Sequence, residues 1–520
     1  MPEPTNVADI VRAHAAAAPD ALAYVLGDRR VSFAELDERS NRVAQGLRAA
    51  GVGAGDRVAI LDKNCLEYFD VLFGAAKLNA VLVAVNWRLA PPEAAFIVND
   101  AAAKVLVVGE ELVGLLEGFE SDLTSTTTIL VIGDHDRHPS YEPWVSSYDA
   151  VDPGVVAGPN DVAFQYYSSG TTGVPKGVML TNSACFASLG ASKDLLKFDD
   201  ESVSMAVMPQ FHVAGGFWGL VALYLGRPCV LQRDVDPVGI VDLIAEHRVT
   251  HAVYVPALLQ VLNMVPGIAD ADLSSMQCLV YGASPISEEV LVASVRTFGC
   301  DFLQAYGMTE TSGGCVFLPP EDHDPEGPNR HRLRAAGIAG PGTDLQVVDA
   351  ELKPVAVGEV GEVLIRSPQN MSGYWNQPAE TERTLLPDGW LRTGDAGYMD
   401  EDGYLYIHDR VKDMIISGGE NVYPAEVENR LMAHPDIVDV AVIGVPSERW
   451  GETPKALVVR VPGSTVTDVD VIAFAREGLA HYKCPTSVDW LDELPRNPSG
   501  KILKNTLREP YWKGHERRVG

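Results

Sequence analysis

The chain has 520 residues, of which 46% are hydrophobic, so it can bury a large core and a disordered chain is excluded. Its 41 Lys and Arg residues against 71 Asp and Glu residues give a formal net charge of −30. A field this acidic repels phosphate backbones and anionic lipid headgroups, so we expect no nucleic-acid partner. Any anionic ligand must therefore be bound by a local cluster of positive groups.

The cysteines and the apolar segments indicate the compartment. Seven cysteines are scattered along the chain without a C-x-x-C pair, which disfavours a disulfide framework or a zinc site and favours reduced thiols. The first residues lack the basic-then-apolar pattern of a signal peptide. The longest apolar run, residues 213–226, is too short for a transmembrane helix and is predicted to be a buried segment. We expect a soluble, cytoplasmic protein.

The first hundred residues alternate helical and strand-like patterns. Ser32 to Glu35 predicts a capping box that opens a helix through about Ala50. Strands are then predicted at 57–61, 81–85 and 104–108, with helices at 67–78 and 92–99. This βαβα alternation predicts a largely parallel sheet with helices on both faces. The glycines at 51–55 lie between a helix and a strand, the reverse of a dinucleotide fingerprint, and are predicted to form a loop.

A glycine-rich segment follows the next predicted strand, residues 161–167. Residues 168–177, Ser-Ser-Gly-Thr-Thr-Gly-Val-Pro-Lys-Gly, hold four hydroxyls, three glycines and one lysine. Glycines allow backbone N–H groups to approach an anion, hydroxyls donate hydrogen bonds, and Lys176 supplies charge. The segment is not a Walker A loop, because Pro175 precedes the lysine and Gly177 follows it. It predicts a phosphate site, with a surface turn as the alternative.

Two later segments combine side chains suited to a nucleotide. Residues 304–310, Gln-Ala-Tyr-Gly-Met-Thr-Glu, follow an apolar strand and offer a ring for a base, a hydroxyl for phosphate and a carboxylate for Mg²⁺. Residues 390–395, Trp-Leu-Arg-Thr-Gly-Asp, are predicted to end an antiparallel element with the carboxylate in a turn. A carboxylate can accept hydrogen bonds from both hydroxyls of a ribose.

The pattern changes after residue 340. Short strands such as 361–366 and 403–407, separated by Gly and Asp turns, predict an antiparallel subdomain. Beyond Arg410 the chain predicts a compact α+β unit: a helix from about 424, strands at 438–445 and 456–461, a helix from 469 and a strand near 486. We expect an N-terminal domain over 1–409, a hinge at 410–412 and a mobile C-terminal domain over 413–520.

The segment from Tyr167 to Gly177 resembles the phosphate-binding signature of adenylate-forming enzymes, which include acyl- and aryl-CoA synthetases. The resemblance continues in order along nearly the whole chain and is closest to bacterial fatty-acyl-CoA synthetases over 409–428. It implies an α/β fold with layered, mostly parallel sheets, a small antiparallel subdomain and a mobile C-terminal domain. It also implies three ligands: ATP, CoA and Mg²⁺.

The resemblance assigns roles to residues of the N-terminal part. Glu310 would bind Mg²⁺, Tyr306 would lie against adenine, Thr309 on the α-phosphate, Asp395 on the ribose and Arg410 on ribose or phosphate. The other expected nucleotide-site residues are Ser168, Ser169, Gly170, Thr171, Thr172, Gly173, Lys176, Gly282, Ala283, Ser284, Gly307 and Trp390. Asp409 stands where many members of the family carry glycine.

In the C-terminal part, the resemblance makes Lys501 the catalytic lysine and Lys412 the hinge residue. Ser417, Gly418 and Gly419 would line the pantetheine tunnel. Trp450 would contact CoA, and a core tryptophan is an equal alternative. Cys484 stands near the place of a CoA-gripping arginine in some relatives, so the CoA contacts of that stretch stay open.

The implied reaction has two steps. A carboxylate attacks the α-phosphorus of ATP to form an acyl-adenylate and pyrophosphate, and the CoA thiol then displaces AMP. The acyl pocket would draw on 211–218 and 312–315, with His212 as its gate, glycines leaving room, and Phe217 and Trp218 closing its end. Its apolar wall favours a medium- or long-chain fatty acid, and then an aryl or steroid side-chain acid. Loading of a carrier protein is a further alternative.

Residues 501–520 hold six basic residues and leave peripheral membrane contact open. We also expect a homodimer.

Overall fold

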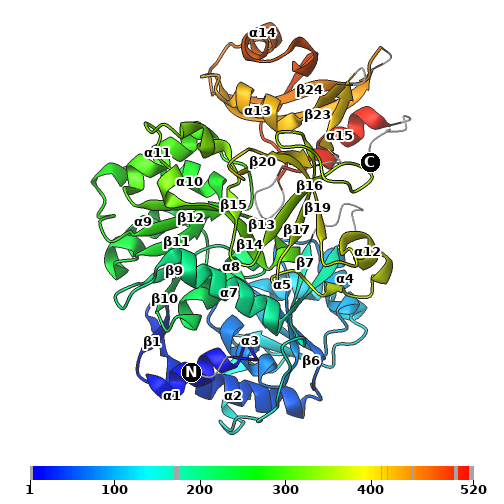
Figure 1. Ribbon diagram of the computed structural model, residues 1–520. Helices are drawn as coiled ribbons and strands as arrows, with labels where there is room; N and C mark the ends of the chain where they lie inside the picture. Colours follow the sequence, from blue (N-terminus) through cyan, green and yellow to red (C-terminus); the bar gives the residue numbers. More distant parts are fainter. Residues whose placement is uncertain are drawn as a thin grey trace.

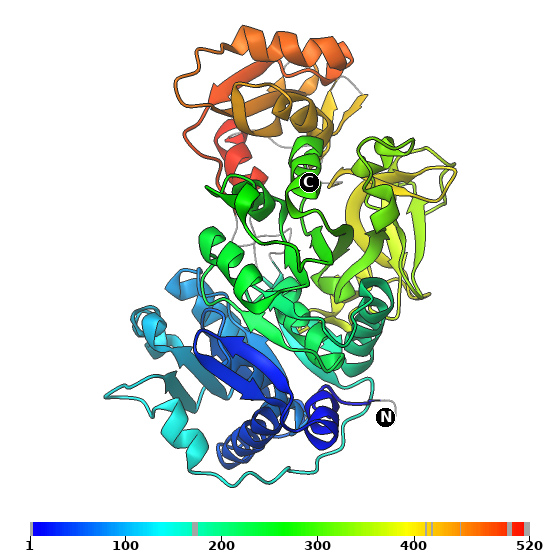
Figure 2. The same ribbon diagram turned by 90° about the vertical axis from the view of Figure 1, so that its left-hand side faces the viewer.

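The computed structural model describes residues 4–168, 175–410, 413–417, 420–447, 449–496 and 502–513, apart from the side chains of 409, 410, 420 and 421. A large N-terminal part contains three sheets, and a separate C-terminal part with its own sheet lies at one end of the molecule (Figures 1 and 2). This layered α/β architecture with a small antiparallel sheet is the predicted fold class.

A seven-stranded sheet carries the first predicted βα units. Its strands run in the order β18-β8-β7-β4-β3-β5-β6, and β7, β4, β3, β5 and β6 are parallel. Their bounds are β3 Arg57–Leu61, β4 Val81–Ala84, β5 Val105–Gly109, β6 Thr128–Ile132, β7 Val162–Ser168, β8 Lys176–Thr181 and β18 Gly373–Tyr374. The associated helices are α2 Phe33–Ala49, α3 Glu67–Ala76, α4 Pro91–Asp100, α5 Val113–Glu117 and α6 Tyr141–Ser146. The predicted capping box at Ser32 is confirmed, because Ser32 and Glu35 bond reciprocally at the start of α2.

A nine-stranded sheet runs in the order β15-β14-β13-β12-β11-β9-β10-β1-β2, with β1 and β9–β13 parallel. The strands are β1 Leu22–Leu26, β2 Arg29–Ser32, β9 Ser204–Ala206, β10 Cys229–Leu231, β11 His251–Tyr254, β12 Cys278–Gly282, β13 Asp301–Met308, β14 Gly313–Leu318 and β15 Ile338–Ala339. The helices of this part are α1 Asp9–Ala17, α7 Asn182–Leu196, α8 Val213–Tyr224, α9 Pro237–His247, α10 Pro256–Leu262 and α11 Glu288–Phe298.

The predicted antiparallel subdomain is confirmed as a four-stranded sheet. Its order is β16-β17-β19-β20, and each neighbouring pair is antiparallel. The strands are β16 Asp344–Val348, β17 Gly361–Arg366, β19 Leu391–Met399 and β20 Leu405–Arg410, and helix α12 Pro378–Thr384 precedes β19. β20 begins two residues later than predicted because Gly403, with a φ of +83°, belongs to the turn.

In the part of the chain that the structure describes, the C-terminal α+β unit contains every element predicted for it and also two short strands and an α-helix. The predicted ones are α13 Pro424–Met432, β23 Ile437–Ser447, β24 Gly451–Arg460, α14 Asp468–Gly478 and β25 Ser487–Trp490. The additional ones are β21 Ile415–Ser417, β22 Glu420–Val422 and α15 Lys504–Trp512. Buried apolar side chains from α13, α14, β23 and β24 form a core of its own. The boundary at 409–412 stays a prediction.

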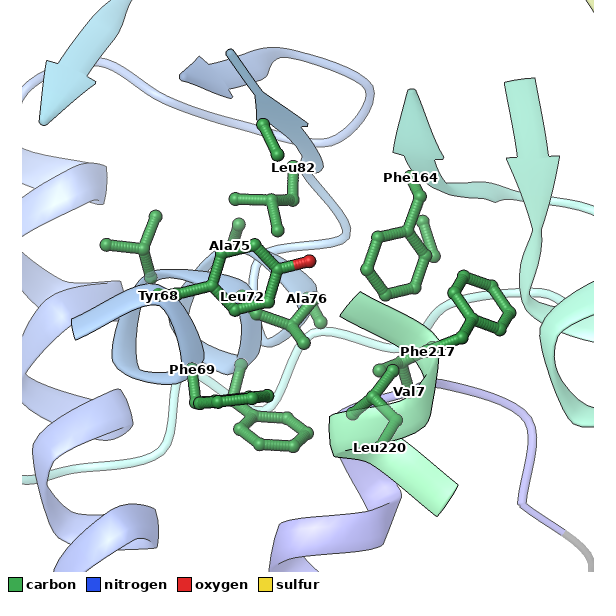
Figure 3. Close-up of a cluster of buried hydrophobic side chains, with 14 of the residues drawn as sticks. Val7, Tyr68, Phe69, Leu72, Ala75, Ala76, Leu82, Phe164, Phe217 and Leu220 are labelled. Atoms are coloured by element: carbon green, nitrogen blue, oxygen red, sulfur yellow. The ribbon is translucent and has the colours of Figure 1, made fainter. Parts of the chain in front are cut away.

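The apolar run at 213–226 is the buried segment that we predicted. It forms α8, and Phe217 and Leu220 of this helix pack toward Phe69 of α3 and Phe164 of β7 (Figure 3). Among the described residues, we find no helix with the length and apolar character needed to cross a membrane. All seven cysteines are free thiols, as predicted.

Candidate active site

Two predicted nucleotide-binding segments meet at the carboxyl ends of two neighbouring strands within the nine-stranded sheet. β12 and β13 are parallel neighbours, with Gly282 paired to Ala305. Gly282 to Ser284 and Tyr306 to Gly307 therefore lie together at the carboxyl ends of adjacent strands, where open α/β sheets bind ligands. A Cβ on Gly307 would lie 1.9 Å from the carbonyl oxygen of Gly313, so only glycine fits between β13 and β14.

Tyr306 and Asp395 connect two sheets. The Tyr306 hydroxyl donates to Oδ2 of Asp395 at 2.6 Å, which brings the predicted adenine and ribose residues into direct contact. Burial, with the neighbouring carboxylate, raises the pKa of Tyr306 well above its ordinary value. The phenol therefore stays protonated and donates to Asp395 at neutral pH.

The turn predicted at Asp395 is wrong. Asp395 lies inside β19, between β17 and β20, and pairs with Arg410 of β20. The Gly-Asp pair resembles a turn because Gly394 has a φ of +69°, but the neighbouring strands hold this irregular position within the sheet. The backbone of Arg410 thus lies opposite the predicted ribose carboxylate. Trp390 precedes β19. The Arg366 guanidinium lies 4.8 Å from the centre of the Trp390 ring, so Trp390 packs with Arg366 and not with Tyr306 or Asp395.

Glu310 collects hydrogen bonds from two other elements. Glu310 is only 5% exposed and follows β13 in the short helical turn at Thr309–Thr311. Oε1 accepts from the Ser168 hydroxyl at 3.2 Å and from the Tyr374 hydroxyl at 2.9 Å. Ser168 ends β7 directly before the glycine-rich segment, so the predicted phosphate and magnesium residues converge here.

The donor set around Glu310 fits Mg²⁺ in one respect. Magnesium prefers oxygen ligands and is usually held in nucleotide sites by one or two carboxylates together with phosphate and water oxygens. Glu310 provides one carboxylate, with two hydroxyl groups beside it. Within the described residues, no three His, Cys, Asp or Glu side chains form a cluster that could hold a metal alone. The site therefore suits an ion shared with nucleotide phosphates.

Lys176 is buried at the start of β8. Its ammonium group forms an ion pair with Glu380 of α12 and lies 5.1 Å from the centre of the Tyr374 ring. Tyr374 and Glu380 were missed from the sequence. Tyr374 belongs to the two-residue strand β18, which reaches the site by pairing with β8 about two hundred positions earlier. Ser169, Gly170, Thr171, Thr172 and Gly173 lie outside the described residues.

The predicted acyl segments lie beside α8 and β14. His212 precedes α8, and its ring lies 4.5 Å from that of Phe211. The room predicted at three glycines is wrong: an added Cβ would lie 2.2 Å from the Pro209 carbonyl oxygen at Gly215, 2.2 Å from Tyr166 Oη at Gly216, and 2.9 Å from Ala305 Cβ at Gly314. At Gly313 nothing lies within 4 Å of an added Cβ, so this one glycine of the four faces open space.

The two bulky residues of α8 have different surroundings. Phe217 packs against Phe164, with 5.2 Å between ring centres (Figure 3). Its ring centre also lies 6.3 Å from that of Tyr166. Trp218 is buried, and its indole N–H donates to the Met205 carbonyl at 2.8 Å. Both side chains therefore pack in the core, Trp218 with its polar atom satisfied and Phe217 against two rings of β7.

A pocket of about 170 Å³ lies next to these acyl segments and was missed from the sequence. Its lining includes Trp87, Arg88, Pro209 and Arg233. The Arg88 guanidinium lies 4.7 Å from the Trp87 ring centre, and Trp87 meets Phe211 edge-on at 6.5 Å. No sequence motif indicates this pocket, because its lining residues come from four separate regions of the chain.

The structure describes some of the predicted C-terminal site residues. Trp450 is 44% exposed, with the Arg449 guanidinium 4.4 Å from its ring, so the alternative of a core tryptophan is wrong. Ser417 is buried and pairs with Gly451 beside it. Cys484 packs in the C-terminal core. Lys412, Gly418, Gly419 and Lys501 lie outside the described residues, as does the side chain of Arg410.

Comparison with known proteins decides the family. The model of the AMP-binding enzyme family matches residues 11–375, and that of the AMP-binding enzyme C-terminal domain matches 426–501. The chain belongs to the AMP-binding enzyme family. It is 39% identical over 515 residues to fatty acid–[acyl-carrier-protein] ligase ScoC of Streptomyces coeruleorubidus, covering 97% of this chain and 96% of the relative.

Two further relatives act on different acids. Long-chain-fatty-acid–CoA ligase FadD13 of Mycobacterium tuberculosis is 36% identical over 512 residues, covering 97% of this chain and 98% of the relative. The structure of the anthranilate CoA ligase AuaEII with anthranoyl-AMP matches with a TM-score of 0.89 and 28% identity, covering 98% of each chain. Family membership confirms the resemblance that the motifs indicated, and the named acids of these relatives are diverse.

Proposed function

We propose that the protein is an AMP-forming acyl- or aryl-CoA ligase that activates an apolar carboxylic acid with ATP. The observation that carries this proposal is the convergence of Ser168, Tyr374 and Glu310 next to the Tyr306–Asp395 contact. An acid–thiol ligase is the enzyme class to which the family membership and the similar ligases point.

In the first step, a carboxylate oxygen attacks the α-phosphorus of ATP, and the bond to the β-phosphate bridging oxygen breaks to release pyrophosphate. Both reactants are anionic, so the protein must neutralise charge and align them. Lys176 would hold the departing pyrophosphate, Thr309 the α-phosphate, and Lys501 the charge that develops between the reactants. Glu310 would hold Mg²⁺, which supplies charge neutralisation when bound.

The adenosine part of ATP would be bound by residues of the nine-stranded and four-stranded sheets. Asp395 and Arg410 would bind the ribose, and Gly282 to Ser284, together with Tyr306, would border the adenine.

In the second step, the deprotonated CoA thiol attacks the acyl carbon and the C–O bond to AMP breaks. Ser417, Gly418 and Gly419 would line the path of pantetheine, Trp450 would contact CoA, and Lys412 would be the hinge between the two steps.

The ion pair between Lys176 and Glu380 bears on the first step. Lys176 already has an anionic partner in this structure. To hold pyrophosphate, its ammonium group must exchange the Glu380 carboxylate for a phosphate oxygen or be shared between them. Replacement of Glu380 by Gln is therefore expected to lower the KM for ATP without lowering the rate at saturation.

A medium- or long-chain fatty acid is the first candidate substrate, supported by the apolar side chains around His212 and by the similarity to ScoC and FadD13. An aryl acid is the second candidate, because Phe217, which packs against Phe164 and Tyr166, would close the end of the acyl pocket and shorten it. Phe217→Ala is expected to shift the preference toward longer acids, and Trp218→Phe, which alters the neighbouring core side chain of α8, is the matched control. An unchanged chain-length profile in Phe217→Ala would remove Phe217 from the pocket.

Free CoA is the proposed thiol, with a carrier-protein thiol as the alternative that the similarity to ScoC raises. The proposal is tested by acid-dependent pyrophosphate release across fatty, aryl and steroid acids, followed by AMP release with CoA or with a phosphopantetheinylated carrier protein. Acid-dependent pyrophosphate release that CoA completes supports the ligase. Absence of release with every acid would contradict it. A cytoplasmic location and a homodimer are further parts of the proposal, tested by fractionation and by light scattering.

A further inference from the structure

The last described helix, α15, is joined to the start of the C-terminal unit by a buried ion pair. Nη2 of Arg508 donates to Oδ1 of Asp413 at 2.7 Å. Arg508 is 6% exposed and Asp413 is 7% exposed. Asp413 directly follows the predicted hinge, whereas α15 begins three residues after the predicted catalytic lysine. The ion pair thus connects two positions that are far apart in sequence, one directly after Lys412 and the other seven residues after Lys501.

The Arg508 side chain is held in place on a helix that is itself well anchored. Its Nη1 donates to Asn505 Oδ1 at 3.0 Å, so both Nη atoms have acceptors, whereas the buried Nε has none among the described residues. Leu507 and Tyr511 pack with Ala441 and Ile443 of β23. The Trp512 indole donates to the Gly444 carbonyl at 2.9 Å. A rotation of α15 relative to β23 would break these contacts together.

The same helix holds one end of the segment that contains Lys501. Arg496 and Ile502 form an isolated β-bridge, and the Leu503 amide donates to the Pro495 carbonyl at 2.8 Å. Lys504, the first residue of α15, pairs with Glu428 of α13 at 3.0 Å. The two residues that flank the 497–501 segment are therefore fixed to each other and to the start of α15.

We propose that Asp413 and Arg508 are positioning residues that couple the backbone after the hinge to the placement of Lys501. This inference rests on the proposed function. When the C-terminal unit reorients, the ion pair makes the first residues after the hinge and α15 turn together, so Lys501 arrives at the acyl and α-phosphate groups in a defined position.

The coupling predicts unequal effects on the two half-reactions. A misplacement of about 1 Å can cost on the order of 100-fold in rate. We expect Asp413→Asn and Arg508→Lys to slow acid-dependent pyrophosphate release by about tenfold to 100-fold. Lysine keeps the charge but lacks the planar fork by which Arg508 donates to Asp413 and Asn505 from two separate nitrogens. Thioester formation from supplied acyl-AMP should change by less than about threefold, since Lys501 acts in the first step.

The matched control is Asp489→Asn. Asp489 accepts from Lys455 and from Tyr511 of α15, so it also anchors this helix, but away from the hinge. Circular dichroism at the assay temperature establishes that each variant is folded. The control should change the rate of either half-reaction by less than about threefold. The double exchange Asp413→Arg with Arg508→Asp should restore part of the rate of acid-dependent pyrophosphate release.

Three results would overturn the proposal: equal losses in both half-reactions, no loss in either, or unfolding of both single variants, which would make the pair a stability element only. Pyrophosphate release by the unaltered enzyme is measured first. If the unaltered enzyme releases none with any acid, the proposed function fails. If it does release pyrophosphate and the variants match it, only the positioning role fails.

Discussion

The Tyr306 hydroxyl lies 2.6 Å from the Asp395 carboxylate and joins β13 of the nine-stranded sheet to β19 of the four-stranded sheet. Each residue is held by its own strand, so the contact joins two separate sheets of the N-terminal part. A carboxylate held in this way can accept hydrogen bonds from ribose hydroxyls without having to be ordered first, which lowers the entropic cost of binding.

Asp395→Asn tests the ribose role. A hydrogen bond to a charged group contributes about 1.5–3 kcal/mol, so the KM for ATP should rise by about tenfold to 100-fold. The measurement is the ATP dependence of acid-driven pyrophosphate release. Tyr398→Phe on the same strand is the control, because its ring stacks on Tyr406 and should keep that contact. A KM that rises equally in both variants would speak against a ribose contact.

Glu310→Gln tests the magnesium role while keeping an acceptor for Ser168 and Tyr374. Loss of one preorganised electrostatic group should slow adenylation by about 100- to 1,000-fold. The Mg²⁺ concentration for half-maximal pyrophosphate release should also increase. Glu362→Gln is the control, since Glu362 pairs with Arg392 on β17 and β19 instead. An unchanged Mg²⁺ midpoint in Glu310→Gln would contradict the assignment.

Lys501→Ala and Lys412→Pro should separate the two half-reactions in opposite directions. The first is expected to block acyl-adenylate formation and largely spare thioester synthesis from supplied acyl-AMP. The second is expected to keep adenylation and lose transfer to CoA, because proline fixes the backbone at the predicted hinge. Equal loss in both half-reactions of Lys501→Ala, or normal turnover by Lys412→Pro, would refute the respective role.

His323 predicts a pH dependence of stability. Nδ1 donates to the Pro319 carbonyl at 2.9 Å and Nε2 accepts from the Tyr281 hydroxyl at 3.0 Å, so the folded protein holds the neutral ring. Burial lowers the pKa of His323 from 6.5 to about 4. In the unfolded chain His323 therefore binds a proton as the pH falls through about 6.5, whereas in the folded protein it binds this proton only near pH 4. The free energy of unfolding should fall as the pH drops through this window.

The expected loss from this group is about 2 kcal/mol between pH 7 and pH 5. It is measured as the change in thermal midpoint over that range, compared between the unaltered protein and His323→Asn, which should lose less. His331→Gln replaces an exposed histidine nearby and should behave like the unaltered protein. Identical pH profiles for the unaltered protein and His323→Asn would show that His323 does not contribute.

The elements with strong local signals were predictable. The strand–helix alternation before residue 110, the antiparallel strands after 340 and the strands and helices at 424–490 all follow from apolar periodicity, caps and turns. α15 was missed because its sequence contains Pro510, which argues against a helix interior. β18 was missed because a two-residue strand carries no periodicity of its own.

For the candidate site, the sequence indicated residues one at a time but not their contacts. Tyr306 and Asp395 were each expected near the nucleotide, yet their bond depends on how two sheets pack, which no local pattern encodes. Asp395 was placed in a turn because Gly and Asp favour turns, whereas strands on both sides keep it in the sheet. The room expected at Gly215 and Gly216 was taken up by atoms from distant segments.

The most direct test of the central claim follows an oxygen atom. The unaltered enzyme is incubated with ATP, CoA and a carboxylic acid labelled with ¹⁸O in its carboxyl group, and the AMP is analysed by mass spectrometry. Attack of the carboxylate on the α-phosphorus predicts one labelled oxygen in the phosphate of AMP, because the later C–O cleavage leaves that oxygen behind. Unlabelled AMP, or ADP formed with labelled phosphate, would contradict an acyl-adenylate.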